Sequence, residues 1–196
     1  MTRLSSELLD RALHLIAVRL EELAAPQEVL VICGGSALLA LGLVNRTTKD
    51  VDVLARVDAS IGLVDPRPLS PTLAKVVDAV GSELDFPQGW LNAGPADQVM
   101  AGFPEGFLSR LIRQEYGPKL IIHYPDRFDL IHLKLFAAVD QGPGRHVSDL
   151  MKLAPTDDEM LSAARWVLTQ DCGEGFALIV KDAVTKIGFP HVAARF

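Results

Sequence analysis

The chain contains little cysteine and no surplus of positive charge. Only two of its 196 residues are cysteines, Cys33 and Cys172, and neither lies in a Cys-x-x-Cys or Cys/His spacing. A disulfide framework and a zinc site are therefore not expected. The formal net charge of -6 argues against a protein that mainly coats nucleic acid, because that affinity requires Lys and Arg to neutralise phosphates.

Long apolar runs are missing as well. Residues 1–7 contain no uninterrupted apolar core of the kind found in a signal peptide, and no segment reaches the roughly eighteen apolar residues of a membrane span. We therefore expect a soluble, cytoplasmic protein without membrane contact. The composition, 49% hydrophobic and 22% charged, is that of an ordinary folded chain, and its length suffices for one sizeable core.

Helical and strand patterns alternate along most of the chain. Helical spacing of apolar residues, Ala and Leu content and capping residues predict helices over residues 4–23, 36–43, 71–84, 130–137, 147–153 and 156–168. Short apolar or alternating runs predict strands over residues 28–33, 50–54 and 119–124. Residues 86–106, rich in Gly and Pro, are predicted to be irregular or partly helical, with Trp90 as an anchor to the core.

Two short motifs carry potential chemistry. Gly34-Gly35-Ser36 follows a predicted strand and begins a helix, so its backbone N–H groups, the serine hydroxyl and the helix dipole can hold a phosphate. Asp50 and Asp52 share one face of a strand, where two carboxylates can bind Mg²⁺. Taken alone, each motif has a simpler interpretation, either as a turn or as the solvated face of a strand.

The order and spacing of these motifs are more informative than either alone. Strand, Gly-Gly-Ser, helix and a strand with Asp-apolar-Asp-apolar resembles the signature of the DNA polymerase β-like nucleotidyltransferase superfamily, whose usual gap is about ten to thirteen residues. Here residues 37–49 supply thirteen. The resemblance looks closest to small prokaryotic nucleotidyltransferases related to the AbiE-type toxins of toxin and antitoxin systems.

A second signature of those proteins is a helical lysine followed by an aspartate on the next short helix, and Lys134 and Asp149 resemble it. The resemblance implies that Lys134 neutralises phosphate charge and that Asp149 orients Lys134 or a substrate. Without it, Lys134 is equally well explained as the solvent-reaching end of a buried helix residue, and Asp149 as a surface or ion-pair residue.

The resemblance also implies a triphosphate site and a metal site. The first motif would hold the triphosphate, and Asp50 and Asp52 would ligate Mg²⁺. Arg46 and Lys49 flank the acids within reach of phosphate, although charged loop residues are usually just solvated. We assign nucleotide binding to four residues: Gly34, Gly35, Ser36 and Lys49.

A third carboxylate, common in active members of the superfamily, is the main departure from the pattern. The predicted strand over residues 119–124 contains no acid and offers only His123, whereas Asp85 lies beside a helix end. Asp85, His123 as a replacement, and complete absence of a third ligand all stay open. Absence would weaken two-metal chemistry without excluding nucleotide binding.

These features predict an α/β (α+β) fold in which a short mixed sheet is flanked by helices. We expect a nucleotidyltransferase-like core with an N-terminal helix over residues 1–153, and a helical C-terminal extension packed on it over residues 154–196. The predicted partners are a nucleoside triphosphate, an acceptor and an antitoxin protein.

The predicted activity is Mg²⁺-dependent transfer of a nucleoside monophosphate to a hydroxyl of RNA, of tRNA or of a protein. Three alternatives remain. The chain can be an inactive nucleotide-binding or protein-interaction module on the same fold, a structural or antitoxin-like module whose paired acids are merely surface residues, or an enzyme with a small-molecule acceptor.

Overall fold

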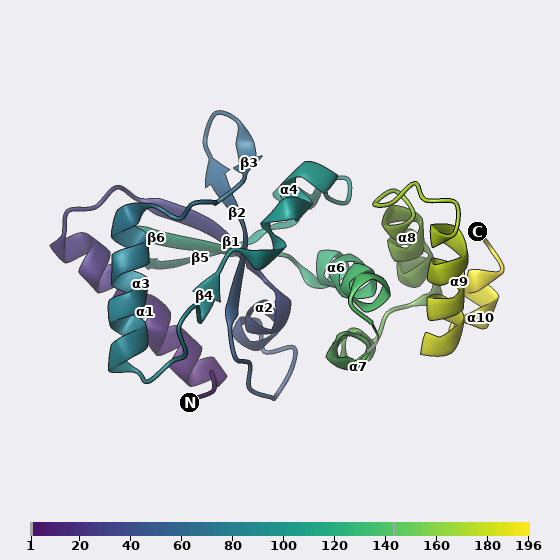
Figure 1. The fold of residues 1–196 in the computed structure, drawn as a ribbon, viewed down its shortest axis with the longest axis horizontal. Helices are drawn as coiled ribbons and strands as arrows, with labels where there is room; N and C mark the ends of the chain where they lie inside the picture. The colour runs from purple at the N-terminus through teal and green to yellow at the C-terminus, as the bar shows by residue number, and fades with distance from the viewer. Residues whose placement is uncertain (1, 143) are drawn as a thin grey trace. The chain divides into compact units, whose positions relative to one another are not determined.

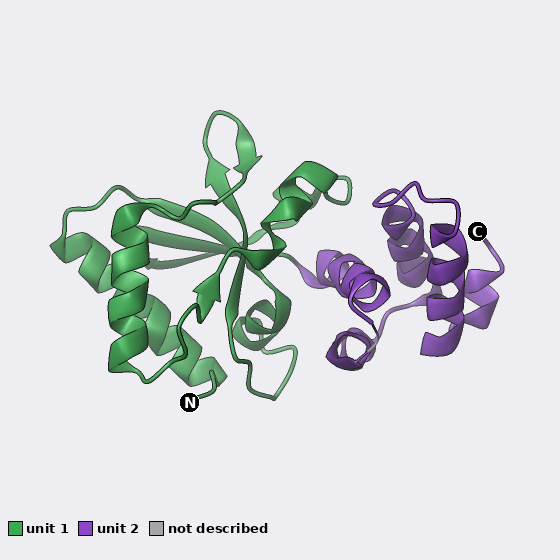
Figure 2. Cartoon of the chain, viewed as in Figure 1, with its two compact units in different colours: residues 1–125 green, residues 126–196 purple. Residues whose placement is uncertain are grey.

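The computed structural model describes residues 2–142 and 144–196, and within them the chain forms two compact units, Met1–Pro125 and Asp126–Phe196 (Figure 2). The division between units lies earlier than the predicted boundary after residue 153. Compactness alone does not define a domain that folds independently. The predicted boundary therefore stays a prediction.

Six strands of the first unit form one mixed sheet within the described residues (Figure 1). The strands are β1 (Glu28–Cys33), β2 (Val51–Asp58), β3 (Gly62–Val64), β4 (Leu91–Asn92), β5 (Ile112–Gly117) and β6 (Leu120–Tyr124). Their order is β3-β2-β1-β6-β5, and β4 pairs separately with β2. Because β1 is parallel to β6 and antiparallel to β2, the sheet is mixed, as the sequence predicted.

Helices α1 (Ser6–Glu22) and α3 (Pro71–Glu83) contact one another in this unit. Each is preceded by an N-cap serine whose side chain accepts a backbone N–H: Ser5 from Leu8, and Ser70 from Leu73, both at 3.2 Å. Such caps satisfy helix N–H groups that have no partner within the helix. Both helices confirm the sequence prediction within two residues at either end.

The sheet contains two edge strands that the sequence did not predict. The short β3 forms a hairpin with β2 that projects beyond the body of the sheet (Figure 1). The edge strand β5 was also missed, because polar and charged residues separate its two apolar ones, Ile112 and Tyr116, and leave no run of apolar alternation. Its pairing with the predicted β6 defines it.

The irregular segment over residues 86–106 contains β4, a 3₁₀ turn (Gly94–Asp97) and the short helix α4 (Gln98–Ala101), and is followed by α5 (Phe107–Arg110). Trp90, only 2% exposed, donates its indole N–H to the carbonyl of Val77 at 3.1 Å. Its ring packs on Gly81, where a β-carbon would lie 2.6 Å from Nε1. Trp90 therefore anchors this segment to α3, as the sequence predicted.

The second unit is helical throughout its regular structure. Its helices are α6 (Arg127–Asp140), α7 (Gly144–Lys152), α8 (Asp157–Val167), α9 (Phe176–Ile187) and α10 (Pro190–Ala193). This confirms the predicted helical character of the C-terminal residues. The glycine and proline break predicted between α6 and α7 includes Pro143, which lies outside the described residues.

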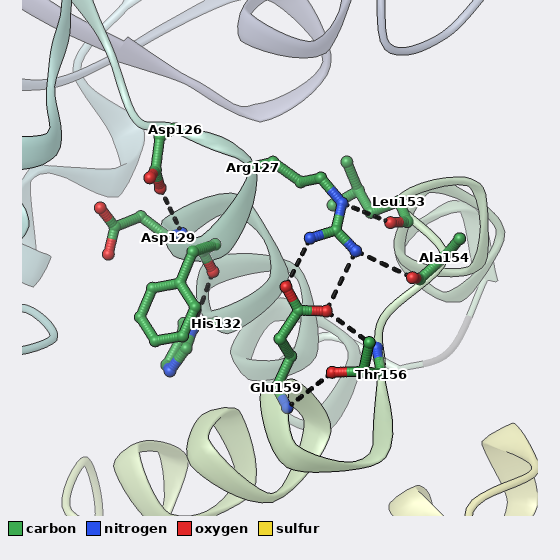
Figure 3. Close-up of polar contacts among 9 residues, drawn as sticks. Asp126, Arg127, Asp129, His132, Leu153, Ala154, Thr156 and Glu159 are labelled. Carbon is green, nitrogen blue, oxygen red and sulfur yellow. Dashed lines mark hydrogen bonds and ion pairs between the residues drawn. The ribbon is translucent and has the colours of Figure 1, made fainter.

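One arginine joins three parts of this unit (Figure 3). Arg127 donates to the carbonyls of Leu153 and Ala154, both at 2.8 Å, and to the carboxylate of Glu159, at 3.0 Å from its Nη2. Glu159 also accepts the backbone N–H of Thr156, whose hydroxyl accepts the N–H of Glu159 in return. This capping box begins α8 as predicted, and the Arg127 hydrogen bond lowers the pKa of Glu159 to about 2.

Among the described residues, no helix combines the length and the apolar character that crossing a membrane requires.

Candidate functional site

The two sequence motifs meet at the end of β1. Cys33, the last residue of β1, pairs in register with Asp52 of β2, and α2 (Gly34–Ala40) begins directly after it. Gly34 has φ +70°, a conformation that L side chains rarely adopt. A β-carbon on Gly34 would lie 2.5 Å from Oδ2 of Asp52. The glycine therefore gives the chain a sharp turn and leaves room for the carboxylate.

The second glycine leaves room for different neighbours. A β-carbon on Gly35 would lie 3.0 Å from Nη2 of Arg46 and 3.0 Å from Oγ1 of Thr48. Both side chains come from the connection between α2 and β2, which therefore folds back onto the turn. The sequence predicted that Arg46 lies beside the acids within reach of phosphate, and it gave Thr48 no role. A guanidinium and a hydroxyl beside a backbone turn form surroundings suited to an anion.

Ser36 is turned inward. It is the third residue of α2 and not its cap, it is fully buried, and its hydroxyl donates to the carbonyl of Cys33 at 2.9 Å. The helix starts two residues earlier than predicted because the glycines themselves enter the first turn. The observed hydrogen bond stiffens the junction of β1 and α2, and the predicted contact of Ser36 with triphosphate stays a prediction.

The two acids lie as the alternating pattern predicts. Val51 and Val53 are fully buried, whereas Asp50 and Asp52 are half-buried, so the carboxylates face away from the apolar side of the strand. Asp50 precedes the first residue of β2, and its Oδ1 accepts a hydrogen bond from the Thr48 hydroxyl at 3.3 Å.

The other edge of β2 at this point carries β4, where Asn92 is in register with Asp52. Lys49 is exposed beside Asp50. Two partly accessible carboxylates one residue apart fit Mg²⁺, which prefers hard oxygen ligands and binds through one or two carboxylates plus phosphate oxygens. Asp50 and Asp52 are thus suited to such a cation, and the nucleotide-binding role of Lys49 stays a prediction.

A third protein ligand does not accompany the pair. Among residues 2–142 and 144–196, no three His, Cys, Asp or Glu side chains are grouped so that they can hold a metal ion. Asp85 instead accepts a hydrogen bond from the Thr2 hydroxyl at 3.2 Å. Neither candidate that the sequence left open therefore forms a three-residue metal group with Asp50 and Asp52.

The sheet register explains why His123 is remote from the acids. His123 of β6 pairs with Val31 of β1, two residues before Cys33, and β1 separates β6 from β2. With about 4.8 Å between strands and about 3.3 Å per residue, this offset corresponds to about 12 Å from Asp52. Burial, together with the nearby charge of Arg113, lowers the pKa of the His123 imidazole.

The remaining predicted site residues belong to the second unit. Lys134 of α6 donates to Oδ2 of Asp149 of α7 at 2.9 Å, and the two side chains are only 6% and 1% exposed. The pairing considered from the sequence is therefore present as a buried ion pair. The roles of Lys134 toward phosphate and of Asp149 toward a substrate stay predictions.

The fold and the paired motifs define a class of protein. A strand, a Gly-Gly turn, a helix and a strand with two carboxylates, set in a mixed sheet flanked by helices, are the features of a nucleotidyltransferase. The family model described as "Nucleotidyltransferase of unknown function (DUF6036)" matches residues 11–143, and the chain belongs to this family. No curated protein and no solved structure matches the chain.

Proposed function

We propose that this protein is a Mg²⁺-dependent nucleotidyltransferase that moves a nucleoside monophosphate from a nucleoside triphosphate to an acceptor hydroxyl. The contact between Gly34 and Asp52 is the main observation behind the proposal. It brings a backbone turn suited to phosphate against a carboxylate suited to a cation, in a chain of a nucleotidyltransferase family. A nucleotide with its metal needs both at one place.

The proposed reaction is a single displacement at phosphorus. The acceptor oxygen forms a bond to the α-phosphorus, and the bond from this phosphorus to the oxygen bridging to the β-phosphate breaks. Pyrophosphate leaves with the electron pair, and the hydroxyl proton passes to a carboxylate or to water. Asp50 and Asp52 would hold Mg²⁺, which when bound neutralises charge on the triphosphate and on the leaving group.

The other predicted residues take the following roles in the proposal. The N–H groups of the Gly34–Gly35 turn contact the triphosphate, and Lys49 contacts a phosphate from the exposed connection. The Ser36 hydroxyl would join them by leaving its hydrogen bond to the Cys33 carbonyl when the nucleotide binds. In the second unit, Lys134 neutralises phosphate charge. Asp149 holds the ammonium of Lys134, and the observed 2.9 Å ion pair supports this part.

The acceptor and the biological role are further parts of the proposal. We propose a hydroxyl of RNA, in particular tRNA, or of a protein side chain, and a cytoplasmic toxin of the AbiE-like kind, paired with an antitoxin protein. The order of the Gly-Gly-Ser, Asp-Val-Asp, lysine and aspartate motifs along the chain supports this closer relationship.

A second candidate function is nucleotide binding without transfer. It is favoured by one observation, namely that no third acidic or histidine side chain joins Asp50 and Asp52 among the described residues. Two carboxylates suffice to bind a metal and nucleotide complex, whereas two-metal transfer ordinarily uses more ligands.

Incubation of the protein with each labelled nucleoside triphosphate, Mg²⁺ and total RNA or protein separates the candidates. Transfer predicts a labelled acceptor, and loss of the label in the double variant Asp50→Ala with Asp52→Ala. Asp78→Ala, which changes an exposed carboxylate on α3, is the matched control and should label normally. Equal labelling by the double variant would refute the catalytic role, and nucleotide binding without label would favour the second candidate.

A further inference from the structure

The N-terminal segment is tied to the connection that leads into the acids. Leu4 and Thr48 form an isolated antiparallel bridge: the N–H of Leu4 donates to the carbonyl of Thr48 at 2.9 Å, and the N–H of Thr48 donates back at 3.0 Å. Leu4 is fully buried and Thr48 is 3% exposed. The backbone of Thr48 is therefore held in place by hydrogen bonds to the N-terminal segment.

The side chain of Thr48 lies between the two motifs. Its Oγ1 would be 3.0 Å from a β-carbon on Gly35, and it donates to Oδ1 of Asp50 at 3.3 Å. A hydroxyl that is itself buried can change rotamer only at the cost of its packing, so the carboxylate it contacts loses rotational freedom as well. The donated bond also occupies one direction at Oδ1 and leaves Oδ2 for another partner.

We propose that Thr48 is a positioning residue that holds the Asp50 carboxylate in the orientation in which it binds a divalent cation, and that Leu4 fixes Thr48 in place. This inference rests on the proposed function, because it assumes that Asp50 is a metal ligand. It assigns a supporting role to the segment before α1, which lies outside the region matched by the family model. Hydrogen-bond partners of metal ligands tune affinity in this way in other proteins.

Calorimetric titration of the full chain with Mn²⁺ alone measures the affinity for the cation and tests the proposal. Thr48→Val keeps the shape of the side chain and removes the donor, so we expect Mn²⁺ affinity to fall about 10-fold to 100-fold. Thr48→Ser keeps the hydroxyl and should restore affinity to within about 3-fold of the wild type. Thr47→Val, a neighbouring exposed threonine, is the matched control and should bind as the wild type does.

Two further variants keep the outcome decisive. Thr48→Ala removes the hydroxyl without placing a methyl group beside Asp50, and replaces Thr48→Val if thermal melting shows that the latter does not fold. Leu4→Pro removes the N–H that donates to Thr48 and should weaken Mn²⁺ binding in the same direction.

These measurements distinguish failure of the proposed function from failure of the positioning role of Thr48. Wild-type protein that binds Mn²⁺ no better than the double variant of Asp50 and Asp52 would overturn the proposed function. If the wild type binds and a folded Thr48→Val binds equally well, the positioning role alone is overturned. Failure of Thr48→Ser to restore affinity would also overturn it, because the hydroxyl would then not be the group responsible.

Discussion

Gly34 and Asp52 are so close that a β-carbon on the glycine would lie 2.5 Å from Oδ2 of the aspartate. Real β-carbons do not approach other heavy atoms this closely, so only glycine is compatible with the observed position of the carboxylate. At the adjacent Gly35, a β-carbon would instead crowd the side chains of Arg46 and Thr48. The double glycine thus serves two contacts at one turn.

Gly34→Ala should disrupt the candidate metal site as well as the turn. The strained φ of +70° should cost about 1 to 2 kcal/mol of folding free energy, and the added methyl group should displace Asp52. Gly42→Ala is the matched control, because Gly42 has φ +66° but no atom within 4 Å of its β-carbon position. We expect urea denaturation to show a loss in both variants, and Mn²⁺ titration to show weaker binding in Gly34→Ala alone.

Lys134→Met should destabilise the protein strongly, because it leaves the buried Asp149 carboxylate without its cation. Breaking a buried ion pair costs about 3 to 5 kcal/mol, whereas replacing both partners by apolar residues often costs little. The double variant Lys134→Met with Asp149→Leu should therefore recover much of the loss. Lys186→Met removes one partner of an exposed pair (74% and 59% exposed) and should change stability by less than about 1 kcal/mol.

Urea denaturation curves of these variants measure the difference. Simple addition of the two single-variant losses in the double variant would show that the Lys134 and Asp149 side chains contribute independently. Recovery of stability without recovery of nucleotide transfer would separate the packing role of the pair from its proposed catalytic role.

The Arg127 and Glu159 pair should make stability depend on pH in the acid range. The Arg127 hydrogen bond lowers the pKa of Glu159 from 4.5 to about 2. Because the folded pKa is the lower one, the pair stabilises the protein fully above pH 4.5, and this contribution is lost as the pH falls toward 2. Glu159→Gln should lower the melting temperature near neutral pH and reduce its decline over this range.

Thermal melting from about pH 7 to about pH 2 measures this effect. Ser5→Ala is the control, because it removes the hydroxyl cap of α1, at a cost of about 1 kcal/mol, and leaves the surroundings of Glu159 unchanged. Its melting temperature should fall by a similar amount at every pH. An acid transition of Glu159→Gln identical to that of the wild type would contradict the assignment.

Gly81→Ala should loosen Trp90 from α3. A β-carbon there would lie 2.6 Å from Nε1 and 2.8 Å from Cδ1 of the indole, so we expect a loss of about 1 to 3 kcal/mol and a shift of tryptophan emission to longer wavelength. Gly175→Ala, where the β-carbon would meet nothing within 4 Å, should change neither property appreciably. Unchanged emission in Gly81→Ala would show that α3 moves aside instead of the indole.

Local patterns accounted for much of the fold. The strand Glu28–Cys33, the serine cap of α3 and the capping box of α8 were predicted correctly, because each depends on residues within one turn or one strand. The alternation from Asp50 to Val53 was equally local. The strands β3 and β5 were missed, because hydrogen bonds to a neighbouring strand define them and their own residues show no clear pattern.

The sequence by itself determined the strands β1, β2 and β6 and the helices that follow them, the order of the two motifs and the face on which the acids lie, since helix and strand periodicity are properties of the local chain. Only the tertiary structure decided that Gly34 contacts Asp52, that Thr48 joins Leu4 to Asp50, and that His123 is two strands away from the acids. Such distances depend on strand order and register, which are set by packing between segments distant in the chain.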